Sequence, residues 1–286
     1  MSSASVNIVG AGRLGQSLGR LLADSGCYRI AGVLSAHPES SARAVAFIGQ
    51  GEAVGTLAAL PAADYTLLSV PDGAIAGLAE VLACEARFEA NALVFHASGA
   101  GELDLLAPLA ECGIAVGCLH PAYSFAEPAR AVAGFVGTPC ALDGDEVVCA
   151  RLAALATAIG GRPFRLAAGG KAAYHAALSV ASNYLVTLTE LAGQLARQAG
   201  VPDENVAGLI GPLMRQTLEN ALMLGPAAAL TGPIVRGDAG TVARHLAVLP
   251  DDAQAAYRRL GERTVTLAAG RLDAAQRGAL LAMLRD

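Results

Sequence analysis

The chain has 286 residues, of which 54% are hydrophobic and 16% charged, and it contains no tryptophan. A chain of this length accommodates one large domain or two ordinary ones, with enough apolar material for a core. The formal net charge of −5 argues against nucleic acid as the main partner, because proteins neutralise phosphates with a basic surface.

We expect neither a signal peptide nor a membrane span. The first apolar residues are broken by glycines and follow no basic segment, which is atypical of a signal peptide. The uncharged stretch 172–189 is long enough to cross a membrane, but it contains a histidine, an asparagine, two serines and two threonines. Six cysteines without a CxxC pair predict small buried side chains in a reducing compartment, so the expected location is cytoplasmic.

Residues 6–24 are predicted to form a strand, a glycine-rich turn and a helix. Gly10, Gly12 and Gly15 follow the apolar strand in G-x-G-x-x-G spacing, and leucines at helical intervals come after them. In dinucleotide-binding domains the first glycine allows the tight turn, the second lets the backbone approach the pyrophosphate, and the third lets the helix pack on the strand. The alternative is a plain glycine-rich turn. The residues expected to bind the cofactor here are Gly10, Gly12, Arg13, Leu14 and Gly15.

The end of the second predicted strand, residues 28–35, bears on the choice of nucleotide. NAD enzymes usually place an acidic residue about 20 residues after the last glycine, where it binds the ribose hydroxyls. This chain has Ser35 there, followed by Ser40, Ser41 and Arg43. Such a site does not repel a 2′-phosphate, so we expect Ser35 and Arg43 to bind NADP, with NAD as the less favoured cofactor. Alternatively, Arg43 lies on a solvated helix face.

Five further strands are predicted within residues 64–72, 91–101, 113–119, 135–142 and 162–166. Ligands of a doubly wound sheet bind beyond the carboxyl ends of its strands. Backbone N–H groups near Ser98 and Gly99 suit a substrate carboxylate, with a plain turn as the alternative. The strand-end residues expected at the site are Val70, Pro71 and Ser98 beside the cofactor, and His96, Gly99 and His120 beside the substrate.

From residue 171 onward the sequence pattern is helical. Helices are predicted over residues 171–199, 203–224, 239–248, 251–269 and 273–284, separated by prolines and glycines. We therefore expect an α/β protein. A Rossmann-like, doubly wound NAD(P)-binding domain occupies residues 1–168, and an all-helical substrate domain occupies residues 169–286. This arrangement is typical of dehydrogenases that act on small substrates.

The first predicted helix of the second half carries an unusual polar face. Lys171, His175, Ser179 and Asn183 recur every four residues and so lie on one side of an otherwise apolar segment. This set suits a cleft wall better than a solvent face, which is normally rich in Glu, Lys and Arg. The alternative is a solvated Lys171 followed by satisfied interior polar side chains.

Reduction of a carbonyl or imine needs a proton donor as well as a hydride. Lys171 suits this role, because a partly desolvated ammonium gives up its proton more readily than a solvated one. His175, one turn further on, either orients Lys171 or replaces it as the acid. Ser179 is expected to face the substrate from the same side of the helix.

Three weaker candidates concern metal and anion binding. His96, His120 and His175 are far apart in the sequence and have no carboxylate at ligand spacing, so we expect no bound metal. Arg236 is a candidate for binding an anionic substrate. Asp238 is expected to cap the next predicted helix.

Several motifs together resemble one family of predicted oxidoreductases. They are G-A-G-R-L-G, V-P-D, H-A-S-G-A, L-H-P-A-Y-S-F, Y-H-A-A-L-S-V-A-S-N-Y and T-G-P-I-V-R-G-D-A-G-T-V, and they extend over nearly the whole chain. The family joins a Rossmann-like domain to a C-terminal domain of unknown function 2520. This chain departs from typical members because it lacks an Arg immediately after the second strand.

The resemblance implies a fold similar to that of the ketopantoate reductases, pyrroline-5-carboxylate reductases and β-hydroxyacid dehydrogenases. It also implies a C-terminal domain like that of 6-phosphogluconate dehydrogenase. Helical domains of this kind often dimerise, which implies a homodimer. By the same resemblance, Lys171 is the expected proton donor and Asn183 the expected anchor for substrate or nicotinamide.

These observations predict an NADP-dependent oxidoreductase that reduces or oxidises a small carboxylate-bearing carbonyl or imine compound. A ketopantoate-type reductase is one alternative, which the fold permits but no residue singles out. A nucleotide-binding sensor or scaffold without turnover is another. A catalyst needs Lys171 or His175 within reach of the nicotinamide, whereas a sensor does not.

Overall fold

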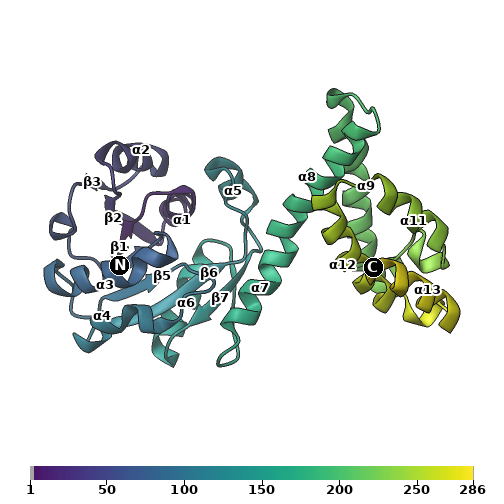
Figure 1. The fold of residues 1–286 in the computed structure, drawn as a ribbon. Coiled ribbons are helices and arrows are strands. Elements are labelled where there is room, and N and C mark those ends of the chain that lie inside the picture. Colours follow the sequence, from purple (N-terminus) through teal and green to yellow (C-terminus); the bar gives the residue numbers. More distant parts are fainter. Residues whose placement is uncertain (1–2, 286) are drawn as a thin grey trace. The chain divides into compact units, whose positions relative to one another are not determined.

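The computed structural model describes residues 3–285 of the chain (Figure 1). The chain divides into two compact units, Met1–Ser182 and Asn183–Asp286. The first unit holds a sheet with helices and the second contributes helices, which confirms the predicted fold class. The domain boundary expected after residue 168 lies just before helix α7 (Lys171–Ala181), which belongs to the first unit, so that boundary stays a prediction.

An eight-stranded sheet forms the centre of the first unit, in the order β3-β2-β1-β4-β5-β6-β7-β8. Neighbouring strands are parallel except β6 and β7, which are antiparallel. The order reverses between β1 and β4, the point where doubly wound sheets open a crevice for ligands. All the predicted strands are present, and β3 is an additional one. The strands are β1 (Ala4–Val9), β2 (Tyr28–Leu34), β3 (Glu52–Val54), β4 (Tyr65–Leu68), β5 (Leu93–His96), β6 (Ala115–Pro121), β7 (Pro139–Asp143) and β8 (Arg162–Arg165).

Helices cover both faces of this sheet (Figure 1). Side chains alternate along each strand, so Leu67 packs in one apolar layer and Leu68 in the other. Both faces are buried, which explains why the strands read as continuous apolar runs. One layer contains α1 (Arg13–Asp24), α2 (Pro38–Ile48), α5 (Pro128–Gly134) and α6 (Glu146–Ala158), and the other contains α3 (Asp72–Glu85) and α4 (Ala107–Glu111).

Helix α7 packs beside strands β6 to β8. Leu119 of β6 lies in the layer of α6, so its neighbours Cys118 and His120 point to the opposite face. Tyr174 of α7 contacts His120 on that face, and its ring meets Phe164 of β8 edge to face at 6.1 Å. The first turn of α7 is thereby held against the sheet.

The second unit packs its helices around a small apolar core. Helices α9 and α11 begin and end at the predicted residues, 203–224 and 239–248. Asp238 Oδ1 accepts a hydrogen bond from the Thr241 N–H at 2.9 Å, which confirms the expected cap on α11. The helices are α8 (Asn183–Gln198), α9 (Asp203–Leu224), α10 (Pro226–Ala229), α11 (Ala239–Val248), α12 (Asp251–Leu267) and α13 (Ala274–Arg285). Four short 3₁₀ turns complete the described chain: Leu57–Ala59, Leu103–Leu106, Ile234–Arg236 and Ala269–Arg271.

The prediction of a single helix over residues 171–199 is wrong in one respect. The chain forms two helices, α7 and α8, interrupted at Ser182, where φ is −114° and ψ is −66°. Typical helical values lie near −63° and −42°. The apolar pattern continues across Ser182, so periodicity alone does not reveal the interruption.

The cysteines divide by their place in the fold. Those on β6, β7 and α6 are buried as expected, whereas those in the turn before β2, on α3 and at the end of α4 are exposed, so the expectation of uniformly buried thiols is wrong for half of them. The buried cysteines are Cys118, Cys140 and Cys149, and the exposed ones are Cys27, Cys84 and Cys112. Within residues 3–285, no helix is both long enough and apolar enough to cross a membrane.

Candidate functional site

The glycine loop after β1 is tied to the ends of both neighbouring strands. Gly10 has a φ of +100°, and a Cβ there would lie 2.5 Å from the carbonyl oxygen of Ser69, so a side chain is excluded on two grounds. The Gly10 N–H donates to the carbonyl of Leu34 at 2.8 Å. The Ser69 hydroxyl donates to the Gly10 carbonyl at 2.7 Å. The loop is therefore rigid before any ligand arrives.

The other two glycines of the loop serve different purposes. A Cβ on Gly15 would collide with the Gly10 carbonyl oxygen, so Gly15 allows α1 to pack against the loop. A Cβ on Gly12 would meet nothing within 4 Å, although Gly12 directly precedes the first turn of α1. That turn, which includes Arg13 and Leu14, contains no acidic residue. Open space at a helix N-terminus without nearby acids fits the close approach of a pyrophosphate.

The turn after β2 follows the strand end at which dinucleotide-binding folds hold the adenosine ribose. The Ser35 N–H donates to the buried Ser41 hydroxyl at 2.9 Å, which fixes the start of α2. Arg43 is exposed and donates to the Ser40 hydroxyl at 3.1 Å. The acid nearest in sequence is Glu39, in the first turn of α2 and not at the strand end. Arg43 and Ser40 thus form a small polar group that suits a phosphate.

A second group of polar side chains surrounds the first turn of α7. Lys171 is only 5% exposed, and its Nζ lies 3.5 Å from Oδ2 of Asp143 at the end of β7. The alternative of a solvated Lys171 is therefore wrong. Cys118 lies on the same face of the neighbouring strand, opposite Asp143 in register. Burial raises the pKa of the Cys118 thiol to about 11, although the Lys171 charge opposes that rise.

His120 is the central group of this region. Its Nδ1 lies 2.9 Å from the hydroxyl oxygen of Tyr174. Tyr174 directly precedes His175 on α7. Burial lowers the pKa of His120 to about 4, and the charges of His175 and Lys171 act in the same direction. Burial raises the pKa of Tyr174 to about 12. At neutral pH both groups are therefore uncharged.

Gly99 brings two histidines together. A Cβ on Gly99 would lie 2.8 Å from Nε2 of His120 and 2.9 Å from Cδ2 of His175. The loop after β5, the end of β6 and helix α7 thus meet at this glycine. The side chain of His175 is exposed, whereas Gly99 is buried. Of the residues selected from sequence, His120, Gly99 and His175 therefore do converge.

His96 lies beneath this loop and does not reach the surface. It is fully buried, and its Nδ1 accepts a hydrogen bond from the Ser98 N–H at 3.1 Å. Burial is the main cause that lowers the pKa of His96 to about 4. Its Nε2 has no hydrogen-bond partner among residues 3–285. Since the Ser98 hydroxyl accepts from the N–H groups of Ala100 and Gly101, most amides of this loop already have partners.

Comparison with known families defines the two halves of the chain. A Rossmann-like domain model matches residues 1–121, and a domain of unknown function, DUF2520, matches residues 138–264. The chain combines a Rossmann-like domain with a DUF2520 domain. The predicted family resemblance is thereby confirmed. The DUF2520 match includes Lys171, Tyr174 and His175, whereas His96, Gly99 and His120 belong to the Rossmann-like match.

Several solved structures share this fold over more than nine tenths of the chain. A protein of Bacteroides fragilis described as a "putative NADP oxidoreductase" is 25% identical, with 92% of this chain and 98% of that chain covered and a TM-score of 0.76. A protein of Thermotoga maritima is 23% identical over 98% and 100% of the two chains, with a TM-score of 0.63. The pyrroline-5-carboxylate reductase of Streptococcus pyogenes is 12% identical over 98% and 99%, with a TM-score of 0.62. No functionally curated protein gives a significant match.

Three further residues were selected from sequence. Asn183 and Arg236 belong to the helical unit, and both are exposed. Ser179 is half-buried on α7, one turn beyond His175. Within residues 3–285, no three His, Cys, Asp or Glu side chains are arranged to hold a metal ion.

Sequence reasoning missed two residues of the group, Tyr174 and Asp143. Tyr174 directly precedes His175, but nothing in the local pattern identifies His120 as its partner. Asp143 ends a strand that was expected, but its pairing with Lys171 depends on β7 running antiparallel to β6. Asp143 lies at the end of its strand, which was the one available signal, whereas Tyr174 is the fourth residue of α7 and had none.

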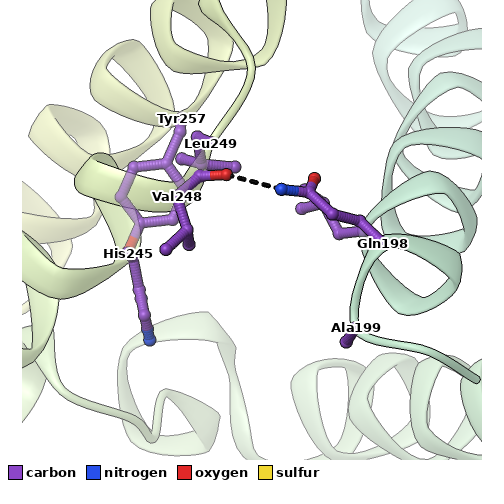
Figure 2. Close-up of a pocket in the computed structure, with 7 residues that line it drawn as sticks. Gln198, Ala199, His245, Val248, Leu249 and Tyr257 are labelled. Atoms are coloured by element: carbon purple, nitrogen blue, oxygen red, sulfur yellow. Dashed lines mark hydrogen bonds between the residues drawn. The ribbon is translucent and has the colours of Figure 1, made fainter.

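The helical unit contains an apolar pocket of its own (Figure 2). Its volume is about 490 Å³, and its lining includes His245 and Tyr257 but none of the residues selected from sequence. The Gln198 side-chain amide donates to the Val248 carbonyl at 2.9 Å across this pocket. We assign no chemistry to it, because its remaining lining residues are Leu195, Ala199 and Leu249.

We expect Gly99→Ala to lower kcat/KM about 100-fold, because a displacement of about 1 Å at a reacting group costs that much. The new methyl would push against both His120 and His175, and His120 is held in place by Tyr174. Steady-state NADPH oxidation with a carbonyl or imine compound that the wild type turns over measures the effect. Gly77→Ala is the matched control, since a Cβ there meets nothing within 4 Å. Equal activity of the two variants would exclude Gly99 from the site.

We expect the first unit to lose stability on acidification from pH 6.5 to pH 4. An unfolded histidine has a pKa near 6.5, whereas that of buried His96 is about 4 in the folded chain. Between these values the unfolded state binds more protons, so the free energy of unfolding falls as pH falls, by about 3 kcal/mol for His96. Urea unfolding at pH 7.0 and 4.5 measures the change. His96→Gln should reduce this pH dependence. If the free energy of unfolding fell equally with pH in the variant and the wild type, His96 would not be its cause.

Proposed function

We propose that the chain is an NADP-dependent oxidoreductase that reduces, or in reverse oxidises, a small carboxylate-bearing carbonyl or imine compound. The observation that carries the proposal is the meeting of His120 and His175 at Gly99, beside the carboxyl ends of β5 and β6. The glycine loop lies at the same edge of the sheet, beyond β1. The NADP oxidoreductase description of the Bacteroides fragilis protein supports the cofactor.

The nicotinamide supplies or accepts the hydride, so the chain's own residues must handle the proton. We assign the proton donor to His175, because its imidazole is exposed beside Gly99 and histidine is the side chain most often used in general acid–base catalysis. Lys171 is buried against Asp143, which favours an electrostatic role beneath the site. Asn183 stays a predicted anchor for substrate or nicotinamide.

The preference for NADP over NAD rests on the turn after β2. Arg43 and Ser40 offer a cation and a hydroxyl, and no acid occupies the strand end to repel a 2′-phosphate. Titration of the protein with NADPH and NADH, followed by nucleotide fluorescence, tests this preference. Arg43→Ala should weaken NADPH binding and leave NADH binding unchanged. Equal affinities in the wild type would overturn the preference.

Turnover is tested by following NADPH oxidation with a panel of 2-oxo acids, ketopantoate and cyclic imines such as pyrroline-5-carboxylate. The proposal predicts turnover of at least one member of this panel. Tight NADPH binding with no turnover of any member would favour the sensor or scaffold alternative. Absence of NADPH binding would overturn the proposal.

We also propose that the helical unit forms a homodimer. Helices α8 and α9 expose large apolar side chains, with Leu222 76% and Met223 84% exposed in the single chain. Apolar surface on this scale marks an interaction site in most proteins. Sedimentation equilibrium tests the state of assembly. A monomer at micromolar concentration would contradict the proposal. The apolar residues exposed on α8 and α9 are Leu185, Val186, Leu188, Leu209, Leu213, Leu218, Leu222, Met223 and Leu224.

A further inference from the structure

Tyr174 and His120 form a hydrogen bond whose donor can be assigned. Tyr174 Oη lies 2.9 Å from Nδ1 of His120, and the two rings are edge to face at 5.6 Å with an interplanar angle of 88°. Phe164 packs against the Tyr174 ring on β8, 6.1 Å between centroids, which restricts that ring. The contact therefore joins two side chains whose positions are fixed by the sheet and by α7.

The relative strength of the two possible hydrogen bonds decides which atom donates. A neutral imidazole carries one N–H and one bare nitrogen, and a phenol carries one O–H. If Nδ1 of His120 donated, the Tyr174 hydroxyl would need another acceptor, and residues 3–285 provide none. If the hydroxyl donates to Nδ1, the imidazole proton lies on Nε2, which has no protein partner and faces the space beside Gly99. Each arrangement leaves one donor for a ligand or solvent, so the shared bond decides between them. A phenol O–H is a stronger donor than a neutral imidazole N–H, and an imidazole nitrogen is a stronger acceptor than a phenol oxygen, so the hydroxyl donates.

We infer that Tyr174 is a positioning residue, whose hydroxyl donates to Nδ1 of His120 and holds the imidazole in the tautomer that presents Nε2–H beside Gly99. Nε2 faces the open space left by the missing Gly99 side chain, across from His175. No hydrogen bond within residues 3–285 occupies that nitrogen.

The chemical class of the ligand follows from this tautomer, and this part rests on the proposed function. An uncharged N–H donates to a carboxylate or carbonyl oxygen, and it cannot bond a group that can only donate, such as an ammonium or a protonated imine. For a 2-oxo acid, either oxygen-bearing group satisfies His120. For an imine substrate, the carboxylate must lie beside Gly99 and the imine nitrogen must face His175.

Nuclear magnetic resonance of histidine-labelled protein tests the tautomer without any cofactor or turnover. Nitrogen-15 shifts distinguish a protonated from a bare imidazole nitrogen, and the His120→Gln spectrum assigns the His120 signals. In the wild type at pH 7 we expect a protonated Nε2 and a bare Nδ1. In Tyr174→Phe we expect shifts averaged between the two tautomers. A protonated Nδ1 in the wild type, or an unchanged spectrum in Tyr174→Phe, would overturn the role of Tyr174.

The chain offers a matched control in its helical unit. Tyr257 and His245 form the same kind of pair, with Oη and Nδ1 2.7 Å apart and rings edge to face at 5.9 Å (Figure 2). Tyr257→Phe should change only the His245 signals. It should leave the His120 signals unaltered, because the two pairs share no residue.

Binding of oxalate, used as a small carboxylate probe with NADP present, tests the ligand class. Oxalate should shift the His120 Nε2–H signal, and Tyr174→Phe should weaken oxalate binding about tenfold, the effect of losing one well-placed hydrogen bond. Tyr257→Phe should bind oxalate as the wild type does. A His120 signal indifferent to oxalate would overturn the ligand class but not the tautomer. Failure of NADP to bind would instead count against the proposed function, and the ligand-free spectra would still decide the role of Tyr174.

Discussion

Gly12→Ala is expected to weaken NADP binding about 100-fold, equivalent to about 3 kcal/mol, and to leave the stability of the protein unchanged. In the ligand-free chain a Cβ at this position meets nothing within 4 Å, and its φ of −73° and ψ of −170° suit an alanine. The methyl group therefore costs free energy only when a phosphate occupies the space over the first turn of α1. Fluorescence titration with NADPH and urea unfolding measure the two quantities separately.

Gly15→Ala is the contrasting variant three residues along the same loop. Its Cβ would collide with the Gly10 carbonyl oxygen and lie 2.6 Å from the Ser69 hydroxyl, both of which hold the loop together. We expect a loss of about 2 kcal/mol in the free energy of unfolding, as for other overpacked sites, together with weaker NADP binding. If Gly12→Ala bound NADPH as tightly as the wild type, the loop would not be a pyrophosphate site.

Much of the fold was predictable because its signals are local. The strand, glycine turn and helix of residues 6–24 lie within a single stretch of sequence, and the helices over residues 203–224 and 239–248 begin and end where prolines and a capping aspartate mark them. The elements that were missed have no such marks. Strand β3 has only three residues, two of them exposed, and so shows no apolar run.

The site was predictable in part. Spacing placed Lys171 and His175 on one helix face, but it could not show that Lys171 is buried and His175 exposed. That difference depends on β7, whose antiparallel pairing with β6 sets Asp143 opposite Cys118. Long-range pairing of this kind leaves no trace in local periodicity, and the partnership of Tyr174 with His120, 54 residues away, was missed for the same reason.

The burial of Lys171 and the exposure of His175 bear directly on which residue donates the proton. We expect His175→Gln to lower kcat at least about 100-fold, since a positioned general acid contributes two to four orders of magnitude. Glutamine keeps the approximate size of the side chain but cannot transfer a proton. NADPH affinity should be unchanged, because none of the residues that shape the glycine loop is altered. Single-turnover kinetics with NADPH and a panel member that the wild type reduces measures the loss.

Lys171→Met should reduce kcat less than tenfold, because the buried ammonium faces Asp143 and Cys118 and is separated from solvent. Methionine fills a similar volume, and Asp143, with 38% of its side chain exposed, can be solvated once the lysine is gone. Asp143→Asn removes the same ion pair but keeps the ammonium of Lys171. Comparing the two variants therefore distinguishes the effect of losing the ammonium from the effect of losing the ion pair. A loss of about 100-fold in Lys171→Met alone, with His175→Gln fully active, would transfer the role of acid from the exposed imidazole to the buried ammonium.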